Sequence, residues 1–125
     1  MSHVMHDAVI VVAAGYAMRG GMTDVPVPDV EAFRVSLPAD WQRLVVGPVR
    51  SVVNDYETWT FLPDGSKEGW EKSEVGDELR KRFAALFSFS YEDGSSPFEV
   101  LHVRFGKPEG DDEPEVTVTR NPQRS

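Results

Sequence analysis

One histidine in the chain stands where it could take part in chemistry. His102 lies in a strand-like stretch with Arg104 two residues after it and Glu99 three residues before it. An imidazole titrates near neutral pH, so His102 could act as a general base in a small polar site with Arg104 and an acid such as Glu99. No neighbouring motif supplies a nucleophile or a substrate group. The simpler interpretation is therefore a sheet histidine without a catalytic role.

The other signatures of enzymes are missing from the sequence. There is no phosphate-binding glycine loop with its lysine, no Gly-x-Ser-x-Gly, no His-Glu-x-x-His and no dinucleotide fingerprint. The absence of cysteine excludes disulfides, thiolate zinc sites and a cysteine nucleophile. His3 and His6 lie near the N-terminus without further spaced ligands. We therefore expect no catalytic residue, no metal site and no cofactor.

Acidic and aromatic residues offer a candidate binding surface instead. Trp70 follows Gly69 among charged residues, and aromatic side chains with a polar group are common anchors of protein interfaces. A burial of Trp70 in the core is an equal alternative, and the acidic run 109–115 could be a solvated loop. The candidate contact residues are Trp70, Glu68, Asp64, Asp111, Asp112 and Glu113.

The charge of the whole chain narrows the class of partner. Thirteen basic and twenty-one acidic residues give a formal net charge of −8 over 125 residues. This charge repels nucleic acid and anionic lipid and favours a basic protein partner. A signal peptide has basic residues before its apolar segment, but no lysine or arginine precedes the apolar run 8–14. This run is also too short to span a membrane. We expect a soluble, cytoplasmic protein.

Residue patterns predict the elements that would position these side chains. The β-branched run 8–12 predicts a strand buried on both faces, and strands are also expected at 49–62, 98–105 and 116–120. A turn at 63–66 should send the chain back in an arm that carries Trp70. A loop is expected at about 19–29. Over residues 30–48 the pattern is weaker: Phe33, Val35 and Leu37 alternate like a strand, and Asp40 could cap a single helical turn.

One helix is expected, at about residues 73–87. Ser73 stands at the N-cap position, and apolar residues recur at helical spacing on one face: Val75, Leu79, Phe83, Leu86 and Phe87. The alternation of Phe87, Phe89 and Tyr91 then predicts a strand, with a turn at 92–95.

These elements predict an α+β fold, a mainly antiparallel sheet of about five strands with one principal helix (residues 73–87) packed on one face. Residues 1–120 would form a single domain, followed by a flexible tail at 121–125. One helix cannot cover both faces of the sheet, and the strand at 8–12 needs cover on both. Residues 20–48 or another chain must therefore supply a second layer.

The sequence favours a non-catalytic protein–protein interaction module, of the inhibitor or immunity type, that binds a basic partner. A structural or accessory subunit of a homo-oligomer is an alternative, because the first strand needs cover. A small enzyme or ligand-binding domain around His102 is a third hypothesis.

Overall fold

The structure is a computed structural model that describes residues 5–14, 28–66, 71–106 and 115–119 of the chain. Its elements are β1 (Met5–Ala14), α2 (Val30–Val35), α3 (Ala39–Gln42), β2 (Val45–Arg50), β3 (Tyr56–Phe61), α4 (Glu71–Ala85), β4 (Phe98–Gly106) and β5 (Glu115–Thr119).

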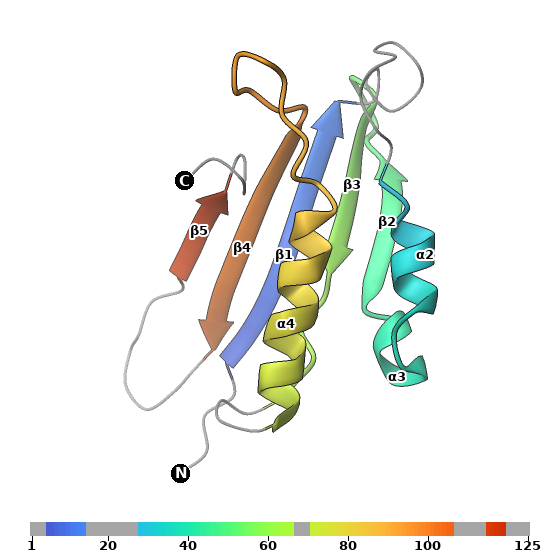
Figure 1. The fold of residues 1–125 in the computed structure, drawn as a ribbon, viewed down its shortest axis with the longest axis vertical. Coiled ribbons are helices and arrows are strands. Elements are labelled where there is room, and N and C mark those ends of the chain that lie inside the picture. The colour runs from blue at the N-terminus through green and yellow to red at the C-terminus, as the bar shows by residue number, and fades with distance from the viewer. Residues whose placement is uncertain (1–4, 15–27, 67–70, 107–114, 120–125) are drawn as a thin grey trace.

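The strands form an antiparallel sheet in the order β2-β3-β1-β4-β5 (Figure 1). Up to β4, the order of elements with β1 and β3 central resembles the split β-α-β arrangement called ferredoxin-like, with two short helices, α2 and α3, between β1 and β2. The predicted α+β class and antiparallel sheet are confirmed. All three described helices lie on the same face of the sheet (Figure 1), so the prediction of one covering helix was incomplete.

The core lies between the sheet and this helix layer. In antiparallel pairs, directly opposed residues point to the same face. Val11 lies opposite Trp59 on one side and Val100 on the other, and all three are buried. Phe83 of α4 brings the aromatic rings together: its centroid lies 5.9 Å from Phe33, 5.7 Å from Phe61 and 5.3 Å from Phe87.

The strand expected from Phe33, Val35 and Leu37 is wrong, because residues 30–35 form α2. Asp29 caps this helix by accepting a hydrogen bond from the Ala32 amide at 2.9 Å. Val30, Phe33 and Leu37 are buried, while Val35 is 60% exposed. The buried residues are thus spaced as on a helix. Phe33 and Leu37 fit both the helical and the strand-like spacing, which explains the wrong prediction.

The single strand predicted over 49–62 is also wrong, because the chain reverses within it. Strand β2 ends at Arg50 and β3 begins at Tyr56. Asn54 and Asp55 take φ values of 66° and 53° between them, and these residue types tolerate the left-handed conformation best among non-glycines. The residues on both sides of this turn favour strands, so the sequence pattern did not indicate the hairpin between β2 and β3.

The helix α4 begins and ends two residues before the predicted 73–87, so Ser73 lies inside it. Leu79, Phe83 and Phe87 are buried as expected, whereas Val75 is exposed. The strand expected at 87–91 is absent, because residues 86–97 form a loop with a turn closed by the Tyr91 amide on the Ser95 carbonyl at 2.7 Å. The predicted arm with Trp70, the loop at 19–27 and the tail lie outside the described residues.

We predict that Phe83→Ala lowers the free energy of unfolding by about 3–5 kcal/mol, because it removes a fully buried ring from the centre of the aromatic core. Urea unfolding followed by circular dichroism measures this loss. Val35→Ala, at an exposed helix position, is the control and should change the free energy by less than about 0.5 kcal/mol. Equal effects of the two substitutions would contradict the described core.

Candidate functional site

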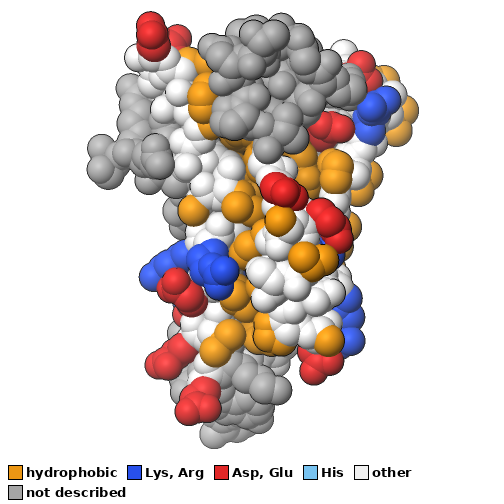
Figure 2. Space-filling model, turned by 45° about the vertical axis from the view of Figure 1, so that its right-hand side comes forward, with side chains coloured by type: hydrophobic (Ala, Val, Ile, Leu, Met, Phe, Trp, Pro, Cys, Tyr) orange, Lys and Arg blue, Asp and Glu red, His pale blue; other side chains and the backbone are white. Residues whose placement is uncertain are grey.

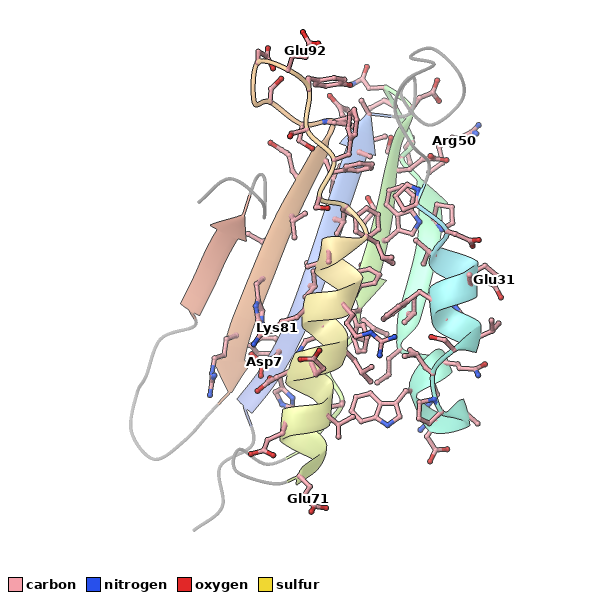
Figure 3. The ribbon with its side chains drawn as sticks, viewed as in Figure 1. Asp7, Glu31, Arg50, Glu71, Lys81 and Glu92 are labelled. Atoms are coloured by element: carbon pink, nitrogen blue, oxygen red, sulfur yellow. The ribbon has the colours of Figure 1, made fainter. Side chains whose placement is uncertain are left out.

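A buried arginine on α4 gathers three carboxylates at one end of the sheet. Arg80 is 3% exposed, and its Nη1 donates to Asp64 Oδ2 at 3.1 Å. Its Nη2 donates to Asp77 Oδ1 at 2.8 Å and lies 3.9 Å from Asp7 Oδ2. Figure 3 shows Asp7 at the lower end of β1, close to α4. The arginine therefore ties its helix to the first strand and to the turn after β3.

The Asp64 carboxylate reaches this arginine because the turn and the helix approach each other closely. The Ser66 amide donates to Asp64 Oδ1 at 2.7 Å and fixes the carboxylate. A Cβ at position 76 would collide with Asp64 Oδ2, so any other residue there would displace this carboxylate. Burial would raise the pKa of Asp64, but hydrogen bonds from Ser66 and the hydrogen bond and charge of Arg80 together lower this pKa below its ordinary value.

His102 joins the same cluster through Asp7. Its Nε2 lies 3.3 Å from Asp7 Oδ1, and the imidazole is 45% exposed. Arg104 lies opposite Asp7 in the register and shares this face. Glu99, the acid proposed from the sequence, lies opposite Val12 and points to the other face. The structure thus brings His102 and Arg104 together and places Asp7, from another strand, where Glu99 was expected.

Sequence reasoning missed Asp7 and Arg80 as partners of this cluster. Asp7 directly precedes the buried run of β1, and a buried acid requires a partner, so its position indicated an ion pair. An arginine one residue after Leu79 on the apolar side of the helix was another. Their partners lie far away in the sequence, so neither signal identified the contact.

The cluster has the form of an ion network that holds the fold together. A carboxylate that orients a histidine is also part of many general-base sites. Here, however, Asp7, Asp64 and Asp77 are all engaged by Arg80 or His102. Within the described residues, no group of three or more His, Asp or Glu side chains could hold a metal ion. The buried Arg80 Nε has no hydrogen-bond partner among these residues.

The sequence-based contact set is largely outside the described residues. Glu68 and Trp70 lie in 67–70, and Asp111, Asp112 and Glu113 lie in 107–114. Asp64 is described, and its side chain is turned inward to Arg80 rather than toward a partner. The role of the other five residues stays a prediction.

The second candidate site is the face of the sheet opposite the helices, which we call the open face. The register places on it the side chains of His6, Ala8, Ile10, Val12, Ala14, Val46, Val49, Tyr56, Thr58, Thr60, Glu99, Leu101, Val103 and Phe105. No described helix lies on this face, and Figure 1 shows every helix on the other side. Val46 and Phe105 are each 39% exposed. The face is mainly apolar.

A β-bulge increases the apolar content of this face. Val46 pairs with Thr60 and Val49 pairs with Thr58, so β2 has one residue more than β3 between these pairs. The extra residue brings both valines to the open face. Gly47 has a φ of 121°, and a Cβ there would lie 2.6 Å from the Thr58 carbonyl oxygen, so the bulge requires glycine at this position.

The outer edge of β2 is blocked by an arginine. Arg34 of α2 donates from Nε to the Val45 carbonyl at 3.0 Å and from Nη2 to the Gly47 carbonyl at 3.2 Å. The Leu44 carbonyl accepts from the Leu62 amide, on the side of β3, so the alternating carbonyls of 45 and 47 point outward. Pro48 has no amide hydrogen to donate. This edge is therefore a poor template for an added strand.

The surface over the helices is different in character. Figure 2, which brings the α2 side forward, shows acidic and basic side chains scattered among hydrophobic ones over the helices and the adjoining edge. Exposed ionic side chains such as Glu31 and Lys81 belong to this layer. The helix side thus has the mixed surface of a solvated face.

Comparison of the chain with protein-family models, with curated proteins and with solved structures finds no match. None of the described helices is both long enough and apolar enough to cross a membrane.

We predict that protonation of Asp64 destabilises the fold. Its pKa is lowered in the folded state, so its stabilising contribution is present above the unfolded value of about 3.9 and is lost as the pH falls through the folded value. Asp64→Asn should therefore reduce the loss of stability between neutral pH and this acid range, measured as the free energy of unfolding in urea. Asp40→Asn, at an exposed position on α3, is the control. Identical pH profiles for Asp64→Asn and the native chain would contradict this role.

Proposed function

We propose that this chain is a non-catalytic protein–protein interaction subunit and that the open face is its contact surface. One observation carries the proposal: an antiparallel sheet has helices on one face, while the opposite face is lined by valine, isoleucine, leucine, threonine and aromatic side chains. Contiguous apolar surface of this kind is typical of interaction sites on small proteins.

The arrangement of polar groups supports an interaction function over catalysis. Asp64 and Asp7 connect Arg80 of α4 to the sheet, and Asp7 also lies beside His102, so these charged groups already have structural partners. Binding requires less: a surface that gains free energy when water leaves it. The open face supplies this surface through its apolar side chains.

This proposal changes the expected contact residues. The sequence predicts that Asp64 and other acidic residues attract a basic partner, but Asp64 is buried against Arg80. At the centre of the open face, Thr60 lies between Ile10 and Val46, and none of the three carries a charge. Hydrophobic burial, rather than charge attraction, is the proposed source of affinity.

Position-specific photocrosslinking in intact cells tests the proposal. A photocrosslinking amino acid replaces Thr60 at the centre of the open face or, as the control, Val35 on the exposed side of α2. We expect a protein adduct at position 60 that is absent at position 35, because the proposed partner binds the open face and not the exposed side of α2. No adduct at position 60, or equal adducts at both, would overturn the proposed function.

A further inference from the structure

We infer that the occupant of the open face is a second copy of this chain, packed face to face about a two-fold axis; this inference rests on the proposed interaction function. In such a contact the same residues of both copies meet, so the face must suit itself in charge, shape and area. The described residues of the open face meet these three requirements as follows.

Charge favours this face for self-association. A chain with a formal net charge of −8 repels a second copy wherever acidic surfaces meet. Among the described residues of β1 to β4, Glu99 is the single carboxylate that the register places on the open face, beside Val12 near one end. His6 lies at the other end, with its ring 5.2 Å from that of Phe105. The rows between these ends are uncharged.

Shape favours the packing of two sheets. The central row of the open face consists of Val46, Thr60, Ile10 and Leu101 in directly paired positions. Short and β-branched side chains of this kind form the even surfaces of two-layer sheet sandwiches, in which inner faces stack about 10 Å apart. A second copy presents an identical row, and no deep pocket or protruding anchor is needed.

The area of the open face reaches the lower limit for a dimer interface. Strands β2 and β3 have six residues each, and β1 and β4 have ten and nine. With strands about 4.8 Å apart and about 3.4 Å per residue, these four strands present roughly 500 Å² of face. Two copies therefore bury roughly 1,000 Å², which is about the minimum area of a biological interface.

The blocked edge disfavours one alternative mode of self-association, the pairing of two copies through β2. Two sheets could join edge to edge through β2, but Arg34 occupies its outward carbonyls at Val45 and Gly47. The bulge and Pro48 further interrupt the ladder that a second β2 would need. Stacking of the open faces leaves this edge unchanged.

Light scattering coupled to size-exclusion chromatography of the full chain tests the inference. We expect a mass of twice the 14.0 kDa of one chain. Because the two copies carry the same charge, added salt should strengthen the dimer by screening the repulsion. A complex with a basic partner would weaken with salt instead.

A matched pair of substitutions locates the contact. Thr60→Lys places a charge at the centre of the stacked faces and should weaken the dimer more than tenfold. Val35→Lys introduces a lysine on exposed α2 and should leave the dissociation constant unchanged. Circular dichroism of both variants verifies that they remain folded, and Thr60→Ser, which keeps a small neutral side chain, should still dimerise.

The outcomes separate this inference from the proposed function. A monomer at all concentrations, or a dimer that Thr60→Lys and Val35→Lys affect equally, overturns the second copy as occupant. If the crosslink at position 60 then joins the chain to a different protein, the interaction function stands without self-association. If position 60 gives no adduct either, both are overturned.

Discussion

The structure depends on one shared aromatic core that holds α2 and α4 on the same face of the sheet. Phe83 of α4 contacts Phe33 of α2 and Phe61 of β3, so the two helices share one apolar surface of the sheet. Burying these rings on one side is the main source of stability in a chain of this size. The consequence is that the other side receives no helix from the described residues, although its own side chains are largely apolar.

The charged cluster has a supporting role in this arrangement. Arg80 lies on the same helix as Phe83 and reaches Asp64 and Asp7, which flank the sheet at one end. Removing one member of a buried ion network leaves its partners desolvated and unpaired, so the network favours one position of α4 over others. Gly76 makes the close approach possible by leaving room for the Asp64 carboxylate. The hydrophobic contacts thus hold α4 on the sheet, and these polar residues fix its position there.

Local patterns in the sequence predicted much of the fold, and the failures have physical causes. The strands near residues 8–12 and 98–105 were found because β-branched and aromatic residues are dense there. The short α2 was mistaken for a strand because Phe33 and Leu37 fit both periods. The pairing of Asp7 with His102 could not be predicted, since it depends on which strands become neighbours. The open face was anticipated in part, because the first strand needed more cover than one helix gives.

The rate at which a thiol on the open face is modified in solution shows whether a second copy covers this face. The chain has no cysteine, so Thr60→Cys and Val35→Cys each introduce a single thiol whose rate of modification by a soluble reagent can be measured. If two copies stack through the open face, the thiol at position 60 reacts more slowly as protein concentration rises, while the thiol at position 35 does not change. A rate at position 60 that is independent of concentration, in a chain that remains monomeric, would contradict the account.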